Sequence, residues 1–582
     1  MQGPGRGRSG QKRVATLLFE KSYPTTREVL AGGLDCRAVE IWSFDDVSTR
    51  WALESDLAGQ GIRARARAAL KPLVCAFLEE IPTASLRAAR ITYPVHPAAH
   101  PQRFLREAYP LPAMFPHVAF EFGPAPATSA MPAYHLHLTY VGGQTRVLEV
   151  LAPNAVSDQG VLSPCGWLIA DGAARRMATT YEAIFQDALA AIAAMDWRPP
   201  PCFEELNIAV TLPSRDEALG CGHEVLSLTE ALHEELYFSV LEYFQRRFGR
   251  PPEDRSLQPG QIVPEVVQGP ACSLRVELRP WDSGLPVQTA QPLETAPEAP
   301  GPRQLAEELA CIPGQAFATR SVAGRHVEAR YLAGRDRAVM ISAGQHANEV
   351  SGPVGALRAA RELARRDGAH FTICPLENPD GYALRHRLAG DNPRHLLHAA
   401  RYTALGDDLE YRDNTPEAER AIRDQARALS GAFFHVSLHG YPGHEWLRPL
   451  SGYLPRGYEE WTLPRGFFLI LRYHPGWADP ARRLIEDTAL RLGRLPGLGA
   501  RNLAQMALAQ GHGVPSGEVI GAIPCRLVES DRGPVPLTLI TEYPDETLQG
   551  AAFVAAHEAQ RAAVIAAYEA FQALDGWDWP LV

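Results

Sequence analysis

The chain after Arg303 alternates between short apolar runs and longer amphipathic stretches, and this alternation restricts the fold more than any other feature. Runs rich in strand-forming residues lie at 338–342, 371–376, 433–439, 467–471 and 537–541, and helical periodicity lies at 352–366, 416–431, 481–493 and 550–574. Strands and helices that alternate in this way form a sheet with helices on its faces. We therefore predict an α/β domain with a mixed, largely parallel sheet flanked by helices.

The residues before this domain have a different pattern. Apolar and polar residues alternate at 134–141 and 145–151, and the Gly142-Gly143 pair between them predicts an antiparallel hairpin. Helical periodicity follows at 175–195 and 227–249. None of these segments carries a motif for chemistry. We predict an N-terminal α+β accessory region.

A proline-rich stretch separates the two regions. The stretch from Pro280 to Pro302 contains six prolines, and such a composition is typical of an extended linker. A second, weaker break falls near Trp197–Pro201. The predicted organisation is a disordered tail at 1–13, an α+β lobe at 14–198, a second accessory α+β lobe at 199–280, the linker at 281–302 and the α/β domain at 303–582.

Four residues with the chemistry of a metal centre follow predicted strands of this domain. His346 and Glu349 come directly after the run at 338–342, and an imidazole and a carboxylate at this spacing can reach one metal ion. Alone, the pair is also compatible with an ordinary loop at a helix start. His439 and Glu542 each end a later strand-like run. Because ligands collect at the carboxyl ends of strands in open α/β sheets, we expect the four to lie together.

A further motif, Asn378-Pro379-Asp380-Gly381-Tyr382, follows the run at 371–376. In the order H-x-x-E, N-P-D-G-Y, strand-end His and late strand-end Glu, the chain resembles the zinc carboxypeptidases of the M14 type over roughly residues 303–575. The resemblance implies a catalytic domain that binds about one Zn²⁺ per chain and hydrolyses an amide or peptide bond. It also implies roles for the four residues: His346, Glu349 and His439 as metal ligands, and Glu542 as general base.

Two arginines compete for the role of stabilising the oxyanion that forms during such a reaction. The Arg401-Tyr402 pair before Asp408-Leu409 resembles a segment of the aspartoacylase and succinylglutamate desuccinylase branch, and it favours Arg401. Counting from N-P-D-G-Y, as in the digestive carboxypeptidases, points instead to Arg394. Both remain candidates to contact substrate.

The segment after Asp408 departs from the family. The resemblance places an Asn-Arg clamp for a substrate carboxylate where this chain has Glu410 and Tyr411, with Arg412 one residue late. These three residues are therefore predicted to line the substrate site. Because a carboxylate repels a like charge, Glu410 predicts a neutral or cationic substrate group and not an ordinary C-terminal exopeptidase. The family's mobile substrate-contacting tyrosine has three candidates: Tyr453, Tyr458 and Tyr473.

Composition narrows the class of protein. The net charge of −10 argues against nucleic acid as a partner, and no apolar run is long enough to cross a membrane. Nine scattered cysteines without a C-x-x-C pattern predict free thiols and a cytoplasmic location. The expected partner is a peptide or small amide substrate, and the accessory region shapes access to it or forms a homo-oligomer. Two alternatives stay open: a deacylase of a small N-acyl amino acid, and a protein that binds a peptide without cleaving it.

Overall fold

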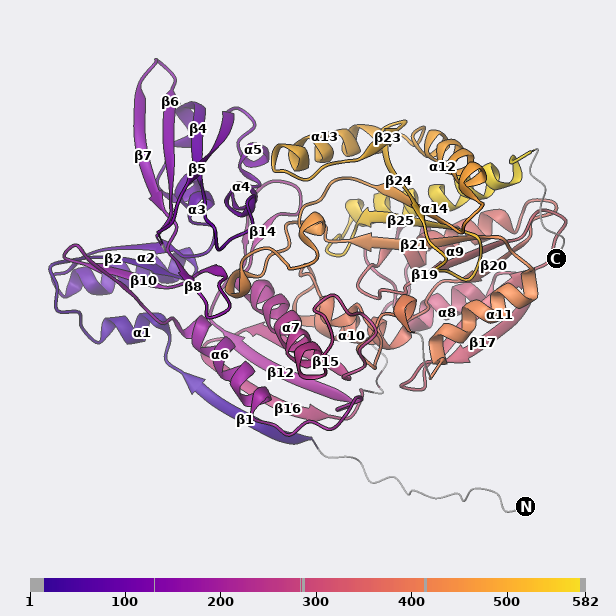
Figure 1. Cartoon of the computed structure of the whole chain (residues 1–582), viewed down its shortest axis with the longest axis horizontal. Helices are drawn as coiled ribbons and strands as arrows, with labels where there is room; N and C mark the ends of the chain where they lie inside the picture. Colours follow the sequence, from indigo (N-terminus) through magenta and orange to yellow (C-terminus); the bar gives the residue numbers. More distant parts are fainter. Residues whose placement is uncertain (1–14, 130, 283, 285–287, 413–415, 576–582) are drawn as a thin grey trace.

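The computed structural model describes residues 15–129, 131–282, 284, 288–412 and 416–575 (Figure 1). The tail predicted at 1–13 lies outside the described residues. Among the helices of the described residues, none combines the length and the hydropathy needed to cross a bilayer.

A mixed sheet forms the centre of the C-terminal domain. Within the described residues its strands, in order from one side of the sheet to the other, are β17 (Gln315–Arg320), β18 (His326–Leu332), β20 (Phe371–Cys374), β19 (Val339–Ala343), β21 (Phe434–Tyr441), β25 (Leu537–Pro544), β22 (Phe468–Tyr473), β24 (Ile523–Glu529) and β23 (Glu518–Ile520). The central strands β20, β19, β21 and β25 run parallel to one another, and antiparallel strands lie outside them. The predicted α/β fold is confirmed.

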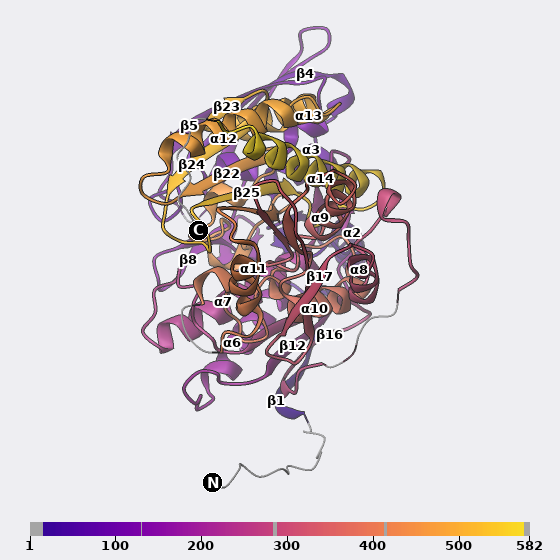
Figure 2. The same cartoon turned by 90° about the vertical axis from the view of Figure 1, so that its right-hand side faces the viewer.

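Helices cover both faces of this sheet, which explains why its central strands are continuous apolar runs. They are α8 (Pro302–Ala310), α9 (Ser351–Leu363), α10 (Pro379–Asp391), α11 (Ala421–Ser430), α12 (Ala478–Leu492), α13 (Leu498–Gly511) and α14 (Ala551–Gln572). In β19, Val339 and Ile341 pack in the core with α9 and α14, whereas Met340 points the other way and packs with Ala426 of α11. Figure 2 shows the two layers, with α12 and α14 above β22 and β25 and α11 below them.

The N-terminal region is built from smaller sheets, at the left and bottom of Figure 1. One sheet orders β1 (Thr16–Tyr23), β16 (Cys272–Arg279), β12 (Glu205–Leu212) and β15 (Gln261–Gln268), and α6 (Thr180–Ala193) and α7 (Leu228–Arg247) pack on it. A second orders β11 (Ala173–Arg176), β10 (Trp167–Ala170), β2 (Ala38–Ser43) and β3 (Arg63–Ala68). The first sheet therefore draws strands from both sides of the boundary predicted near residue 198.

A third sheet orders β5 (Ala119–Pro126), β4 (Leu86–Val95), β6 (Ala133–Tyr140) and β7 (Thr145–Leu151). Its β6 and β7 form the predicted hairpin, and Gly142 and Gly143 between them have φ of 91° and 83°, a region that favours glycine. The remaining elements are α1 (Thr26–Ala31), α2 (Val47–Gly59), α3 (Pro72–Glu79), α4 (Arg103–Glu107), α5 (Leu111–Met114), β8 (Asn154–Val156), β9 (Leu162–Pro164), β13 (Glu217–Ala218) and β14 (Val225–Leu226). The α+β character of this region is confirmed.

The proline-rich stretch is packed where the structure describes its second half. Leu293 and Ala299 are 1% exposed and belong to the core of the C-terminal domain, and the carbonyl of Pro300 accepts a 2.8 Å hydrogen bond from the Tyr382 hydroxyl. The prediction of an extended linker is wrong for this half. The prolines prevent a long helix or strand, but the apolar side chains between them, such as Leu293, still pack against α9.

Helix α7 joins the N-terminal region to the C-terminal domain. Its Glu234 accepts a 2.7 Å hydrogen bond from His398, and its Glu230 contacts His444 at 2.8 Å. One apolar core contains residues of both parts, among them Leu236 of α7 and Leu396 and Trp446 of the C-terminal domain. The two parts therefore share buried charges as well as a core.

Candidate metal centre

The four residues singled out from the strand ends lie together at one edge of the large sheet. His346 and Glu349 belong to the loop between β19 and α9, His439 lies in β21, and Glu542 lies in β25. His439 and Glu542 are partners in the parallel register of β21 and β25, so their side chains emerge next to each other. Strand ends that are adjacent in space thus collect residues that are far apart in sequence.

His346, Glu349 and His439 are arranged like the ligands of one metal ion. One potential ligand atom from each lies within 4.8 Å of the other two, and all three side chains are buried. The Nδ1 atoms of the two histidines are 3.1 Å apart, and the Glu349 carboxylate contacts them at 2.8 and 3.0 Å. Two imidazoles and a carboxylate are a common protein donor set for catalytic zinc, with further positions open for water and substrate.

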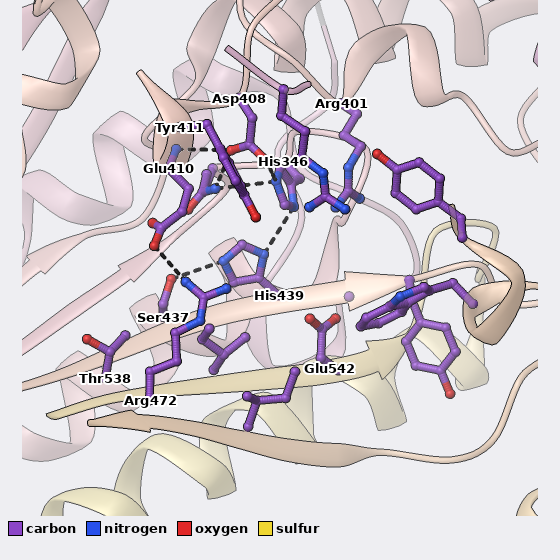
Figure 3. A pocket seen from close by; sticks show the side chains of 18 of the residues that line it. His346, Arg401, Asp408, Glu410, Tyr411, Ser437, His439, Arg472, Thr538 and Glu542 are labelled. Carbon is purple, nitrogen blue, oxygen red and sulfur yellow. Dashed lines mark hydrogen bonds and ion pairs between the residues drawn. The ribbon is translucent and has the colours of Figure 1, made fainter. Parts of the chain in front are cut away.

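The opposite nitrogen of each histidine has its own partner (Figure 3). Nε2 of His346 lies 3.2 Å from Asp408 Oδ2, and Nε2 of His439 lies 3.1 Å from Ser437 Oγ. A carboxylate only accepts, so Asp408 holds a proton on Nε2 of His346, and a metal ion in the cluster would take the lone pair of Nδ1. Metal-binding histidines are oriented by partners of this kind, and the residues present therefore fit a zinc ion.

The N-P-D-G-Y motif braces the loop behind this centre. Asn378 caps α10 by accepting a 2.9 Å hydrogen bond from the Gly381 N–H, and its amide nitrogen donates to the carbonyl of Tyr402 at 3.1 Å. A Cβ on Gly381 would meet the carbonyl oxygen of Ala400 at 2.5 Å. Only glycine lets helix and loop approach this closely. The motif thus fixes the backbone on either side of Arg401.

Arg401 reaches the cluster, whereas Arg394 does not. Nη1 of Arg401 donates to Glu349 Oε1 at 2.7 Å, and Arg401 lines the pocket that contains the cluster. Arg394 is exposed and does not line this pocket. The structure therefore corrects the expectation that Arg394 contacts substrate. Counting from N-P-D-G-Y reaches Arg394, but the residues of this segment that line the pocket begin at His398.

Charge and burial set the protonation of the site. Burial raises the pKa of Glu542 well above its usual range, and the negative charge of Glu349 raises it further. Burial also acts to raise the pKa of Glu349, but His346, Arg401 and His439 outweigh it and lower that pKa well below its usual range. Neighbouring carboxylates with opposite shifts are typical of sites where one group stays ionised and the other exchanges a proton.

Glu410 and Tyr411 line the pocket, but the charge of Glu410 is compensated. Its carboxylate accepts hydrogen bonds from Arg423 at 2.9 Å and Arg472 at 2.6 Å. The sequence showed neither partner, because Arg472 comes from β22 and Arg423 from α11. The expected repulsion of a substrate carboxylate by Glu410 is therefore corrected, since two cations neutralise the acid.

Arg412 has a structural position. Its guanidinium is fully buried and binds Asp407 through two 2.7 Å hydrogen bonds and Glu419 at 2.6 Å. The expectation that Arg412 contacts substrate is wrong, because its donors are used by two buried carboxylates that would otherwise lack a counter-ion. Asp413, the acid that follows Arg412 in the sequence, lies outside the described residues.

The sequence missed the aromatic wall of the pocket and one cation. Phe238, Arg255, Trp446, Tyr458 and Trp461 line the pocket, and the first two come from the N-terminal region. Of the three candidate tyrosines, Tyr458 lines the pocket, while Tyr453 is buried and donates to Glu445 at 2.7 Å. The helical periodicity at 227–249 does not single out Phe238 as a pocket residue, and nothing in the sequence around Arg255 marks it.

Comparison with known proteins agrees with the motifs. Residues 313–414 match the model of the zinc carboxypeptidase family, a span that includes His346, Glu349 and Arg401 but ends before His439 and Glu542. A search of curated proteins gives no significant match. The resemblance to zinc carboxypeptidases is thereby confirmed, and the C-terminal domain is a metallocarboxypeptidase-like hydrolase domain.

Three solved structures illustrate the similarity. A metallo-carboxypeptidase from Burkholderia cenocepacia is 16% identical, with 52% of this chain and 73% of that chain covered and a TM-score of 0.29. A metallo-carboxypeptidase from Pseudomonas aeruginosa in complex with (2-guanidinoethylmercapto)succinic acid is 15% identical over 51% and 71%, with a TM-score of 0.28. Carboxypeptidase A from Helicoverpa armigera is 10% identical over 64% and 98%, with a TM-score of 0.32.

Proposed function

We propose that the chain is a zinc-dependent peptidase that cleaves an amide bond of a peptide, with Glu542 as general base. The observation that carries this proposal is the convergence of three ligand atoms beside Glu542, with the outer nitrogens of both histidines already held by Asp408 and Ser437. Within the described residues the Glu542 carboxylate has no ion-pair partner, and a binding protein without catalysis would not need such a group next to the cluster.

His346, Glu349 and His439 would hold the zinc ion. Bound there, zinc would supply a Lewis acid that polarises the scissile carbonyl and lowers the pKa of water to about 7. Asp408 and Ser437 keep the Nδ1 lone pairs of the two histidines directed at the ion. The protein part of the mechanism then falls to Glu542 and Arg401.

Glu542 accepts a proton from the attacking water and returns it to the leaving amine. Glu542 is 7% exposed, and within the described residues no other side chain forms a hydrogen bond with its carboxylate. A pKa above the usual range of a glutamate suits a group that both takes and gives a proton near neutral pH. The aromatic wall next to it limits access of bulk water.

Arg401 supports the charge that develops on the carbonyl oxygen. It lies next to the ligand cluster, and its loop is fixed by Asn378 and Gly381. A cation that is fixed in advance needs little reorganisation when the negative charge forms. Its bond to Glu349 must loosen as the guanidinium turns to substrate.

The test separates metal binding from chemistry. Glu542→Gln should retain zinc and lose turnover of a blocked peptide by roughly 10²- to 10⁴-fold, since it removes a base and no ligand. His439→Ala should lose most of the zinc, measured by elemental analysis. Glu546→Gln is the matched control, because it removes another buried carboxylate four residues away that does not line the pocket. Full turnover by Glu542→Gln would reject the proposal.

A further inference from the structure

A loop of the N-terminal region runs along the segment that carries Asp408. The carbonyl of Arg255 accepts a 2.9 Å hydrogen bond from the Asp408 N–H, and the Gly260 N–H donates to the carbonyl of Leu405 at 2.9 Å. The side-chain amide of Gln258 donates to Asp407 at 2.9 Å. These bonds fix the loop at residues 255–260 against the wall of the metal site.

The side chain of Arg255 enters the pocket between two tyrosines. Its guanidinium carbon lies 5.3 Å from the ring centre of Tyr411 and 5.0 Å from that of Tyr458. Rings that contact the faces of a guanidinium hold it in place by cation–π attraction. The donors of the group lie in its plane and stay available for another partner.

Arg255 differs from the other arginines of the pocket in having no acid to bind. Arg401 pairs with Glu349 and Arg472 pairs with Glu410. In the part of the chain that the structure describes, no carboxylate lies within ion-pairing distance of the Arg255 guanidinium, and no side-chain hydrogen bond occupies it. A fixed cation without a counter-ion, in a partly buried pocket, is suited to an anionic ligand.

We propose that Arg255 binds a carboxylate of the substrate, so that the accessory region supplies a specificity residue to the catalytic pocket. This inference rests on the proposed function, since it assigns the substrate class of the same site. Arg255 would take the place of the Asn-Arg clamp that the family has where this chain has Glu410 and Tyr411. The charge of Glu410 is neutralised by Arg423 and Arg472, and the ring of Tyr411 stacks on the Arg255 guanidinium. The carboxylate comes from the C-terminus of a peptide or from an acidic side chain.

Four peptides distinguish these two sources. They are acetyl-Phe-Glu and acetyl-Phe-Gln, each with a free C-terminus and as the C-terminal amide. Binding is measured by calorimetry to zinc-loaded protein carrying Glu542→Gln, so that turnover does not consume the peptide. Adding Arg255→Gln should raise the Kd of peptides with the recognised carboxylate by roughly 10- to 100-fold. The Kd of acetyl-Phe-Gln amide, which has no carboxylate, should not change.

A matched control lies in the same segment. Arg250 is 55% exposed and pairs with Asp254 at 3.5 Å, so Arg250→Gln removes a nearby arginine that faces solvent. It should leave all four affinities unchanged. Arg255→Lys keeps the positive charge but loses the planar guanidinium, which can donate two parallel hydrogen bonds to a carboxylate. This variant should retain part of the affinity for the peptides with the recognised carboxylate.

Two results would overturn the inference. One is an Arg255→Gln effect that is absent or equal for all four peptides; the other is a lack of any binding that depends on a carboxylate. Turnover of the same peptides by the wild-type protein tests the proposed function separately. Absence of turnover together with loss of carboxylate-dependent binding in Arg255→Gln would reject the peptidase and retain the binding site.

Discussion

Replacing Asp408 with asparagine tests the orientation of the metal ligands. Asp408 Oδ1 accepts hydrogen bonds from Gln345 at 2.8 Å and from the Glu410 N–H at 3.0 Å, and Oδ2 faces Nε2 of His346 at 3.2 Å. In Asp408→Asn the remaining oxygen is expected to stay with its two donors. The new amide then points an N–H at His346, which favours the tautomer with its proton on Nδ1. That tautomer cannot bind zinc through Nδ1.

The size of the effect follows from this change of partner. Losing an outer partner of a ligating histidine usually lowers metal affinity by roughly 10- to 100-fold, or about 1.4 to 2.7 kcal/mol. Asp408→Asn also removes a negative charge that lies 3.2 Å from the ring of His346, where it would attract the bound cation. We therefore expect the upper part of this range.

Zinc affinity is measured by competition with a chelator of known affinity, and thermal unfolding of the zinc-free protein verifies that the variant folds. Ser437→Ala is the control, since it removes the neutral partner of the other histidine and should cost less. A folded Asp408→Asn protein with a zinc affinity within twofold to threefold of the wild type would refute the reasoning.

Two further predictions concern buried charges shared by the two parts of the chain. Lys71→Met leaves Glu445 buried without its cation, so the free energy of unfolding, measured in urea, should fall by about 3–5 kcal/mol. The double variant Lys71→Met/Glu445→Gln removes the unpaired charge as well and should regain part of that loss. Burial lowers the pKa of His444, but Glu230 outweighs it and raises that pKa to about 9, above about 6.5 in an unfolded chain. Stability from this pair should be complete below pH 6.5 and lost as the pH rises toward 9, and His444→Gln should remove that slope in urea titrations across pH.

The part of the site that lies at strand ends could be predicted from the sequence. His346, His439 and Glu542 follow apolar runs of the right length, and the topology of a parallel sheet then brings them to one edge. Asn378 and Gly381 belong to a motif that the sequence shows, but their role in bracing the Arg401 loop depends on a helix cap and a close backbone approach that exist only in the folded chain.

The charged residues after Asp408 could not be assigned in the same way. Glu410 and Arg412 are two positions apart, yet one lines the pocket and the other is fully buried among carboxylates. A short 3-10 turn at Leu409–Tyr411 separates them, and Glu410 pairs with Arg423 and Arg472 while Arg412 pairs with Asp407 and Glu419. Local sequence does not determine such a turn, because the ion pairs that select it come from Glu419, Arg423 and Arg472 on distant elements.

The N-terminal region is part of the pocket and not an appended module. Phe238 and Arg255 line the site, Glu234 of α7 binds His398 in its wall, and Lys71 holds Glu445 in the loop beyond β21. Each of these contacts joins a polar or aromatic group of one part to the other in a buried position, where an unmatched partner is costly. The accessory region supplies a cation and part of the aromatic wall that face the substrate. Substitutions in that region can therefore change the specificity of the site while the metal ligands at the strand ends stay the same.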